Sequence, residues 1–366
     1  MNAMIKKLLQ GQAVEWKTLG EVVKLEKGKQ LNKELLFESG LYPAYNGGVS
    51  YSGFTDIYNY EENTIIISQG GASAGFVNFV TTKFYANAHC YVVLPKNEMV
   101  ENRFIYHFLK LNQEKMMTKQ HGAGIPALRT NEILTLKIPI PPLSVQSQIV
   151  QILDTFTELT EQLTEQLTAE LSMRQKQYHY YRDLLLSEHE LAKVGFEWKR
   201  LGEVAKIKHG KDWKKLAIGD IPVYGSGGIM GYVDTFSYDK PSVLIPRKGS
   251  ITNLFYVETP FWNVDTIYYT QIDTSQILPK FLYYFIKTID LMQLDTGSGR
   301  PSLTQAILNK IQIPIPPLSI QSQIVQILDT FDALTQSISD GLPKEIQLRQ
   351  KQYEYYRELL LGFPMI

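Results

Sequence analysis

Residues 138–186 read IPIPPLSVQSQIVQILDTFTELTEQLTEQLTAELSMRQKQYHYYRDLLL, and residues 313–361 read IPIPPLSIQSQIVQILDTFDALTQSISDGLPKEIQLRQKQYEYYRELLL. Aligned without gaps, the two copies are identical at 33 of 49 positions. A repeat this close indicates that the chain contains one structural unit twice.

Each copy predicts a long helix. No helix can run through the Pro-Ile-Pro-Pro start, because proline lacks a backbone donor and holds the preceding residue extended. Ser144 and Ser319 are expected to cap the helices that follow. Apolar and aromatic residues then recur every three or four positions, as in a coiled coil. We expect a continuous first helix and a second helix that breaks near Gly341, where Gly-Leu-Pro interrupts the pattern.

Two near-identical helices offer each other the same apolar stripe. An amphipathic helix in an arbitrary protein is more often an ordinary part of a core. The duplication favours a different arrangement, in which the two stripes are buried against each other. We therefore predict an antiparallel coiled-coil pair with a pseudo-twofold internal repeat.

The segments before each helix are duplicated as well. EWKTLGEV at residues 15–22 returns as EWKRLGEV at residues 197–204. Later matching segments are short strands ending in glycine turns (22–29 and 204–211), second glycine turns (43–48 and 222–228), apolar strands with polar loops (65–71 and 243–249), aromatic-rich strands (84–91 and 261–268), helical patterns (102–109 and 279–286) and glycine-proline closing loops (122–128 and 297–303).

These patterns mix strands and helices, so the predicted fold class is α+β. It has two mixed α/β domains, joined and separated by the two long helices. The expected boundaries are residues 1–143 for the first domain, 144–190 for the first helix, 191–312 for the second domain and 313–366 for the second helix. Both domains have an ordinary size.

Composition limits the compartment and the chemistry. The 366 residues are 44% hydrophobic, but no apolar run approaches 18 residues, and residues 1–10 are too short and charged for a signal peptide. Cys90 is the single cysteine, so no intramolecular disulfide can form, and the six histidines show no paired ligand spacing. We expect a cytoplasmic protein without a structural metal.

The charges are distributed unevenly although they sum to zero. Residues 1–143 and 197–312 each carry a net charge of +3, whereas residues 144–190 carry −5 and residues 313–366 carry −2. Solvated surfaces also produce such differences by chance. The distribution nevertheless fits basic DNA-reading domains on acidic helices that bind protein.

The order of these motifs resembles the specificity subunit of type I restriction-modification enzymes. The resemblance spans essentially the whole chain and is carried by the IPIPPL-x-x-Q helix starts, the W-K-x-L-G-E-V domain starts, the G-x-G-x-P-x-L closing loops and the RQKQY-x-YYR helix ends. It implies two target recognition domains, each reading half of a bipartite, asymmetric DNA sequence. It also implies a non-catalytic subunit, which agrees with the lack of an Asn/Asp-Pro-Pro-Tyr/Phe motif and of a P-loop.

The resemblance further implies partners and a cofactor outside this chain. The helices would act as spacer and docking surface for two methyltransferase subunits, which bind S-adenosylmethionine and methylate adenine. Motor-nuclease restriction subunits can join such complexes. Side chains shared by both helix copies are the docking candidates, namely Gln146, Gln148, Arg174, Tyr178, Gln321, Gln323, Arg349 and Tyr353.

Candidate DNA contacts lie in the glycine-flanked loops. Lysines fit phosphate contacts, whereas Arg, Asn and Gln present paired groups that match base edges. The phosphate candidates are Lys27, Lys29, Lys208 and Lys211. The base-reading candidates are Asn46, Gln69, Arg247, Lys248 and Arg300. These loops differ between the halves far more than the helices do, as two readers of different half-sites require and as simple drift would also produce.

Three other functions fit parts of the sequence. A specificity subunit of a two-subunit type II methyltransferase-nuclease would have the same build, and the sequence does not separate it from the type I form. A coiled-coil scaffold without a DNA role would keep the helices but show no salt-dependent DNA affinity. An autonomous metal-dependent enzyme is disfavoured, because no carboxylate cluster recurs in both halves.

Overall fold

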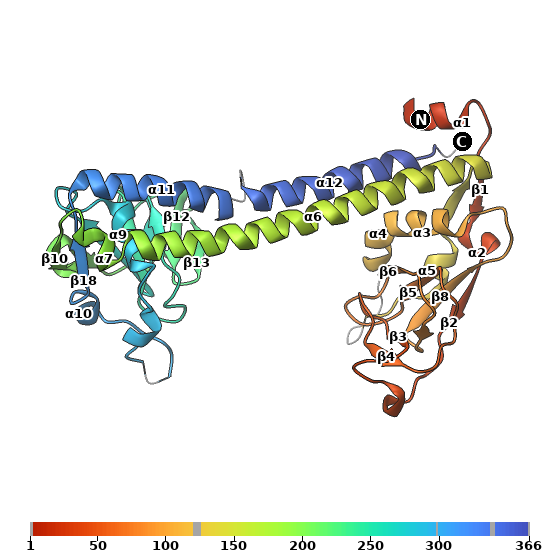
Figure 1. Cartoon of the computed structure of the whole chain (residues 1–366), viewed down its shortest axis with the longest axis horizontal. Coiled ribbons are helices and arrows are strands. Elements are labelled where there is room, and N and C mark those ends of the chain that lie inside the picture. The colour runs from red at the N-terminus through yellow and green to blue at the C-terminus, as the bar shows by residue number, and fades with distance from the viewer. Residues whose placement is uncertain (1–2, 120–125, 298, 337–340, 365–366) are drawn as a thin grey trace. The chain divides into compact units, whose positions relative to one another are not determined.

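The computed structural model describes residues 3–119, 126–297, 299–336 and 341–364. The chain forms two compact units (Figure 1). Unit 1 comprises Met1–Gln166 and Ile346–Ile366, and unit 2 comprises Leu167–Glu345. Each unit therefore combines one globular part with the helix ends that pack on it. Residues 122–125 and Ser298 of the predicted closing loops lie outside the described residues.

Unit 1 contains three sheets, with strand orders β1-β9, β2-β8-β5-β6 and β4-β3-β7. Its strands are β1 Glu15–Thr18, β2 Val23–Lys27, β3 Tyr42–Tyr45, β4 Gly53–Thr55, β5 Thr64–Ser68, β6 Val77–Val80, β7 Tyr85–Ala86, β8 Cys90–Pro95 and β9 Lys137–Ile140. Its shorter helices are α1 Ala3–Leu9, α2 Leu19–Val22, η1 Lys33–Leu35, α3 Asn102–Leu111, α4 Gln113–Met117 and α5 Thr130–Leu134.

Unit 2 repeats those strand orders as β10-β18, β11-β17-β14-β15 and β13-β12-β16. Its strands are β10 Glu197–Arg200, β11 Ala205–Lys208, β12 Ile221–Gly225, β13 Gly228–Val233, β14 Ser242–Pro246, β15 Phe255–Val257, β16 Trp262–Asn263, β17 Ile267–Ile272 and β18 Gln312–Ile315. Its shorter helices are α7 Glu188–Ala192, α8 Leu201–Val204, α9 Pro279–Ile286, η2 Leu291–Leu294 and α10 Gln305–Leu308. Every strand of unit 1 has a counterpart, so the predicted duplication of the domains is confirmed.

Each unit is layered in the same way. A short helix, α3 in unit 1 and α9 in unit 2, lies between the four-stranded sheet and the long helices (Figure 1). The inner strands β5 and β14 are buried along their whole length, because both of their faces are covered. Their runs of Ile, Val and Leu follow from that burial. The predicted helices at residues 102–109 and 279–286 are confirmed as α3 and α9.

The aromatic-rich segments depart from the prediction of single strands. Residues 84–91 supply β7 and the start of β8, and residues 261–268 supply β16 and the start of β17. The two strands of each pair belong to different sheets. In unit 1, the Asn87 backbone carbonyl accepts a hydrogen bond from the Cys90 amide at 3.0 Å, which closes a turn between them. The chain therefore changes sheet at this turn.

The long helices are α6 Leu143–Leu185, α11 Leu318–Gln336 and α12 Leu342–Leu361. The continuous first helix and the interrupted second helix are both confirmed, with residues 337–340 of the break outside the described residues. The predicted serine caps are wrong. Pro142 accepts the first helical hydrogen bonds, from Val145 and Gln146, so the helix has already begun at Ser144.

The helices pair in an antiparallel manner within each unit. In unit 1 the rings of Phe156 on α6 and Tyr356 on α12 stack with centroids 4.9 Å apart. In unit 2 the equivalent rings, Phe331 on α11 and Tyr181 on α6, stack at 5.5 Å. The same two positions of the repeat thus meet twice with their roles exchanged, as the predicted pairing of two copies requires.

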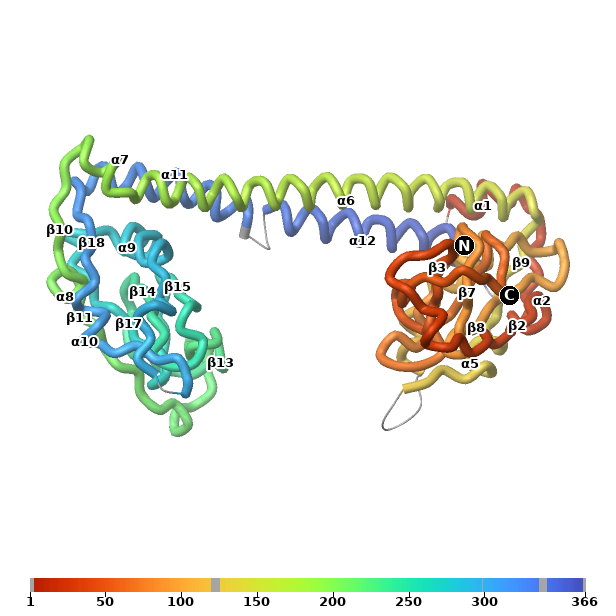
Figure 2. Tube along the Cα trace, turned by 60° about the horizontal axis from the view of Figure 1, so that its bottom comes forward, coloured from red at the N-terminus to blue at the C-terminus, as the bar shows by residue number. Residues whose placement is uncertain are grey.

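Both chain ends belong to unit 1 (Figure 2). Ile5 and Leu9 of α1 are buried in the same core as Leu361 and Phe363 at the end of α12. The Trp16 indole also donates a hydrogen bond to the Pro364 carbonyl at 3.2 Å. The N-terminal helix therefore packs at the end of the last helix.

Candidate nucleic-acid interface

The glycine loops of unit 1 converge on residues 86–89, which we call the anchor segment. The Lys29 amide donates to the Ala86 carbonyl at 3.0 Å, and the Gln69 amide donates to the His89 carbonyl at 2.8 Å. The Tyr45 carbonyl, next to the second glycine turn, accepts a hydrogen bond from the Asn87 amide at 2.9 Å. Three loops that are distant in the sequence thus share one backbone support.

Unit 2 repeats this construction on residues 263–266, its own anchor segment. The Lys211 amide donates to the Asn263 carbonyl at 2.9 Å, the Val264 amide to the Tyr224 carbonyl at 3.0 Å, and the Arg247 amide to the Thr266 carbonyl at 2.8 Å. Backbone atoms make these contacts in both units. We call these hydrogen bonds between the loops and the anchor segment the backbone frame. The frame is independent of the side chains that the loops carry.

The closing loops join the same frame. In unit 1 the Leu128 amide donates to the Gln69 carbonyl at 2.8 Å. In unit 2 the Leu303 amide donates to the Arg247 carbonyl at 2.8 Å, and Lys248 forms an isolated bridge with Ser302. These contacts bring Lys248, which is distant in sequence, close in space to the loop that holds Arg300.

The glycines of the first turns are needed for close approach. A Cβ atom at Gly28 would overlap the carbonyl oxygens of Ala86 and Asn87, and one at Gly210 would overlap those of Asn263 and Val264. Both turns therefore press directly against their anchor segments. Any other residue would push the flanking lysines out of position.

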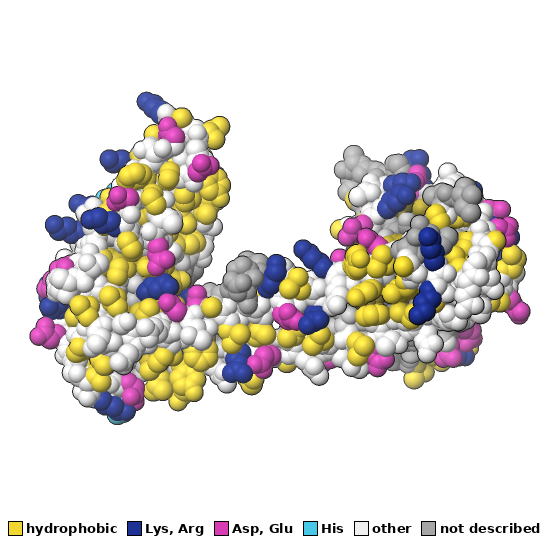
Figure 3. All heavy atoms as spheres, turned by 90° about the horizontal axis from the view of Figure 1, so that it is seen from above, with side chains coloured by type: hydrophobic (Ala, Val, Ile, Leu, Met, Phe, Trp, Pro, Cys, Tyr) yellow, Lys and Arg dark blue, Asp and Glu magenta, His cyan; other side chains and the backbone are white. Residues whose placement is uncertain are grey.

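Most of the predicted DNA-contacting side chains are exposed around these frames. The exposed candidates are Lys27, Lys29, Asn46, Lys208, Lys211, Lys248 and Arg300. On the face shown in Figure 3, Lys and Arg side chains line one margin of unit 2, the unit drawn at the left. The structure brings the candidates of each unit into one loop cluster, and their contact with DNA stays a prediction.

Two of the base-reading candidates have side chains that are partly buried in their units. Gln69 is half-buried, and its Oε1 atom is buried without a hydrogen-bond partner among the described residues. Arg247 is half-buried, and its Nη1 atom donates to the Asp265 carbonyl at 3.3 Å. Both would have to rotate before they could present their end groups to a base edge.

The docking candidates Gln146 and Gln321 are fully buried and bonded inside their own units. Gln146 accepts from the Glu101 amide at 2.8 Å and donates to the carbonyls of Met99 at 3.0 Å and Pro141 at 2.8 Å. Gln321 makes the same three bonds, to Leu278, Gln276 and Pro316, at 2.8, 3.0 and 2.8 Å. Each glutamine ties the helix start to its globular part, so in this structure no partner can reach it.

The remaining docking candidates differ in accessibility. Gln148 and Gln323 are exposed, while Arg174, Arg349 and Tyr353 are half-buried. Tyr178 is only 1% exposed and belongs to the unit 2 core. The Tyr353 hydroxyl accepts a hydrogen bond from Thr157 at 3.0 Å, which links α12 to α6 inside unit 1. Partner binding by the exposed members stays a prediction.

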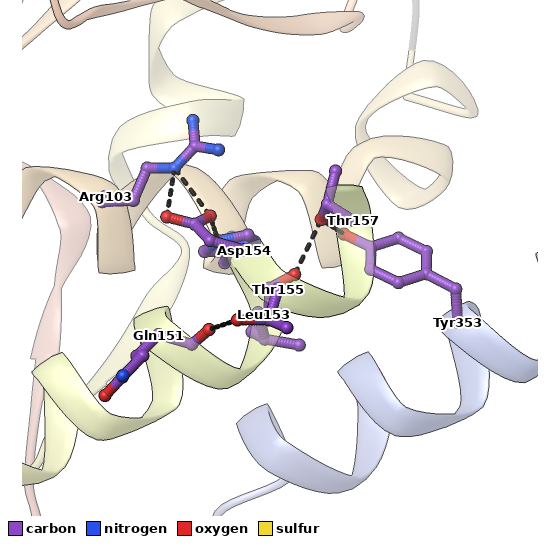
Figure 4. A network of polar contacts seen from close by, with 8 residues as sticks. Arg103, Gln151, Leu153, Asp154, Thr155, Thr157 and Tyr353 are labelled. Atoms are coloured by element: carbon purple, nitrogen blue, oxygen red, sulfur yellow. Dashed lines mark hydrogen bonds and ion pairs between the residues drawn. The ribbon is translucent and has the colours of Figure 1, made fainter. Parts of the chain in front are cut away.

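A carboxylate at the same repeat position holds each globular part to a long helix, and the sequence interpretation missed it. In unit 1, Asp154 accepts from Arg103 Nε at 2.9 and 3.1 Å and contacts His107 Nε2 at 2.7 Å (Figure 4). In unit 2, Asp329 accepts from Lys280 Nζ at 2.9 Å and from the Tyr284 hydroxyl at 2.6 Å. The identical Leu-Asp-Thr-Phe in both helix copies was the available signal.

These contacts shift the ionisation of the groups involved. Burial lowers the pKa of His107 and outweighs the opposing effect of Asp154. Burial alone would raise the pKa of Asp154, but the hydrogen bond from His107 and the charge of Arg103 lower it overall. Burial and the bond to Asp329 raise the pKa of Tyr284. Asp154 is therefore a carboxylate at neutral pH, and His107 is neutral.

Within the described ranges, no group of three His, Cys, Asp or Glu side chains is placed to hold a metal ion. Cys90 is buried, and burial raises the pKa of its thiol to about 11. None of the helices described is long and apolar enough to cross a membrane.

Comparisons with known proteins agree on one family. The family model described as the type I restriction modification DNA specificity domain matches residues 13–173 and 193–348. A Haemophilus influenzae protein assigned as a type I restriction enzyme specificity subunit is 38% identical, over 99% of both chains. The EcoR124I/EcoR124II specificity subunit of Escherichia coli is 31% identical, over 98% of this chain and 97% of that one.

A solved structure supports the fold. The S subunit of a type I restriction-modification system from M. genitalium aligns over 97% of both chains, with a TM-score of 0.58 and 24% sequence identity. At that identity the likeness concerns the architecture alone.

Proposed function

Because the chain belongs to the family of type I restriction-modification DNA specificity subunits, we propose that its two units read the two halves of a bipartite, asymmetric DNA sequence. The long helices would set the gap between the half-sites and hold two methyltransferase subunits. The chain itself is a DNA-recognition subunit, and the chemistry belongs to its partners.

One observation carries the proposal of two unlike readers: equivalent loops rest on equivalent backbone frames but bear different side chains. Position 69 in unit 1 is Gln, while the matching position 247 in unit 2 is Arg. Gln pairs with adenine and Arg with guanine, because their donors and acceptors match those base edges. The two units would therefore read different bases from the same position on the frame.

The proposed phosphate contacts come from Lys27 and Lys29 in unit 1 and from Lys208 and Lys211 in unit 2. All four are exposed and lie within two residues of the glycines that press on the anchor segments. A phosphate contact fixes the orientation of a domain on the duplex but reads no sequence. These lysines would therefore set the register in which the neighbouring loops meet the bases.

The proposed partners complete the complex. Two methyltransferase subunits would bring S-adenosylmethionine, and motor-nuclease subunits would join for restriction. Such a complex would act on cellular DNA, and we expect it in the cytoplasm.

Methylome sequencing of cells with and without this gene tests the function. We expect one bipartite, asymmetric motif to carry methylated adenines only when the gene is present. Loss of methylation at a continuous or symmetric site, or no change in methylation, would contradict the proposal. A point variant in one unit should alter one half-site and leave the other half-site intact.

A salt titration tests the phosphate contacts separately. Each phosphate that a protein neutralises steepens the fall of DNA affinity with salt by about 0.9 in a log-log plot. The Lys208→Ala/Lys211→Ala double variant should therefore reduce that slope by roughly 1.8 without changing the preferred sequence. Lys193→Ala, at an exposed lysine outside the frame, is the control. An unchanged slope in the double variant would remove both lysines from the interface.

A further inference from the structure

Unit 2 contains a cleft of about 770 Å³ that the proposed DNA contacts do not use. Its walls are the edge strand β15, the helix α9 and the helix α11, so it lies between the globular part and the long helix. Glu258, Asp329 and Asp332 line it together with Tyr256 and Tyr283. Among the described residues, Lys280 is the one basic residue that lines it.

The strand that forms one wall has an open edge. β15 pairs only with β14, at one side. Among the described residues, no side chain hydrogen-bonds to the backbone of Phe255–Val257, which leaves the outer donors and acceptors of this strand free. An open strand edge is a template on which an extended segment of another chain can pair.

The edge strand of unit 1 is capped by side chains at its first residue, Val77, whose counterpart Leu254 lies just before β15. The Val77 amide of β6 donates to Gln113 Oε1 at 3.0 Å, and its carbonyl accepts from Lys110 Nζ at 3.0 Å. Lys287, the counterpart of Lys110, points instead toward Asp332, with its Nζ atom 3.9 Å from Oδ1. The two units are thus built alike but differ at the start of the edge strand, where the lysine caps the backbone in unit 1 and approaches a carboxylate in unit 2.

The charge of the cleft differs in the same way. Residues 138–156 and 313–331 are identical at 18 of 19 positions, and the next position changes from Thr157 to Asp332. The position after the edge strand changes from Thr81 to Glu258. Unit 2 therefore carries two carboxylates that unit 1 lacks.

These carboxylates are poorly neutralised. Lys280 is engaged by Asp329, and Lys287 approaches Asp332 only at 3.9 Å. The buried Oδ1 atom of Asp332 has no hydrogen-bond partner in the described part of the chain. Glu258 is exposed, accepts a hydrogen bond from the Tyr256 hydroxyl at 2.8 Å, and has no described cation within ion-pair distance. A negative cleft repels DNA and attracts a basic group.

We propose that this cleft docks an extended, basic segment of a methyltransferase subunit, which pairs with the edge of β15 and places a Lys or Arg side chain between Glu258 and Asp332. The inference rests on the proposed function, because it deepens the identity of the partner site. Unit 1 lacks the two acids, and Gln113 and Lys110 cap the first residue of its edge strand. Two identical methyltransferase subunits would therefore bind the two units unequally.

The test is a titration of the full chain with the methyltransferase subunit, followed by native mass spectrometry at low and high salt. We expect two unequal binding steps. The Asp332→Asn/Glu258→Gln double variant keeps the side-chain shapes and should weaken one step by roughly tenfold or more at low salt, with a smaller effect at high salt. The Asp220→Asn/Asp239→Asn variant removes two exposed acids of unit 2 that do not line the cleft, and should change neither step.

Hydrogen exchange in the wild-type complex tests whether the partner segment pairs with β15, which an attraction between charges alone would not produce. The amides of residues 255–258 should be protected on binding, while those of residues 77–80 should not change. Unaltered binding by the double variant, or unprotected amides in β15, overturns the cleft as the docking site. If the wild-type chain binds no methyltransferase subunit at all, the proposed function itself fails.

Discussion

Gln146 and Gln321 show how a single residue can be mistaken for a contact surface. Both are polar, both recur in the repeat, and both lie on a helix that is expected to bind partners. Their three hydrogen bonds to the backbone of their own unit explain why the two copies keep them. A sequence pattern alone does not distinguish a shared internal anchor from a shared external contact.

Gln146→Ala should therefore destabilise unit 1. It leaves the Glu101 amide and the carbonyls of Met99 and Pro141 without their partner, at a cost of about 2–4 kcal/mol. Faster hydrogen exchange in unit 1, with unit 2 unaffected, measures the loss. Gln148→Ala changes an exposed neighbour and should stay within about 0.5 kcal/mol of wild type. Equal effects of the two variants would contradict the anchor role.

His107 gives unit 1 a pH dependence that the matching position of unit 2 lacks. Burial lowers the pKa of His107 below its ordinary value of 6.5, so the unfolded chain takes up the proton more readily than the folded unit. The contribution of neutral His107 to the folding stability of unit 1 is fully present above pH 6.5. It falls as the pH drops from 6.5 through the lowered pKa, by at most about 1.4 kcal/mol per pH unit. The matching position in unit 2 is Tyr284, which does not titrate there.

Calorimetric unfolding at pH 7.5 and pH 5.5 measures this dependence. His107→Gln keeps a donor toward Asp154 but cannot titrate, so it should flatten the difference between the two pH values. His189→Gln replaces a histidine with 81% side-chain exposure and should leave that difference unchanged. A wild-type difference that survives in His107→Gln would assign the pH dependence to another group.

The first glycine turns provide a test of the backbone hydrogen bonds that hold the loops on the anchor segments. Gly210→Ala places a Cβ atom against the carbonyls of Asn263 and Val264 and should cost unit 2 about 1–3 kcal/mol through overpacking. Because the turn must move, DNA affinity should fall together with stability. Gly227→Ala adds a Cβ atom with nothing within 4 Å and is the control within the same unit. Normal DNA affinity in Gly210→Ala would separate this turn from the interface.

Most elements could be predicted because local patterns fix them. Apolar runs gave the buried strands, three-to-four spacing gave α3, α9 and α6, and Gly-Leu-Pro gave the break before α12. The predicted single strand at residues 84–91 was wrong, because a turn inside an apolar run depends on which sheet each half joins. The serine caps were wrong because Pro142 already serves as the helix start.

The candidate site was predicted at the level of loops but not of single groups. The repeat located the glycine turns, and the structure joins them on the anchor segments through backbone hydrogen bonds that no sequence pattern encodes. Which side chains of these loops and helices are accessible depends on burial, which the sequence patterns did not show. Gln69 and Arg247 lie partly inside their units, and Asp154 and Asp329 were overlooked because carboxylates on an acidic helix are usually solvated.

In the duplicated chain, different parts determine which bases are recognised and how far apart the two half-sites lie. The loops differ between the units, while the helix starts and their anchors are the same. Variation in a loop can therefore change one half-site without moving the other reader. Variation in helix length can change the gap without altering either half-site.

An insertion in α6 tests that separation directly. Four residues added after Leu163 extend the helix by one turn, about 6 Å at 1.5 Å per residue, and keep the apolar stripe nearly in phase. We expect the gap in the recognised sequence to grow by about one or two base pairs, at roughly 3.4 Å per pair, with both half-sites unchanged. Methylome sequencing of cells that carry the lengthened gene reads the gap and the half-sites together. Four residues added in the exposed 218–220 loop of unit 2 provide the control, and they should leave the gap as it is. If the gap stayed constant in the lengthened helix while methylation persisted, the helices would not set the distance between the two readers.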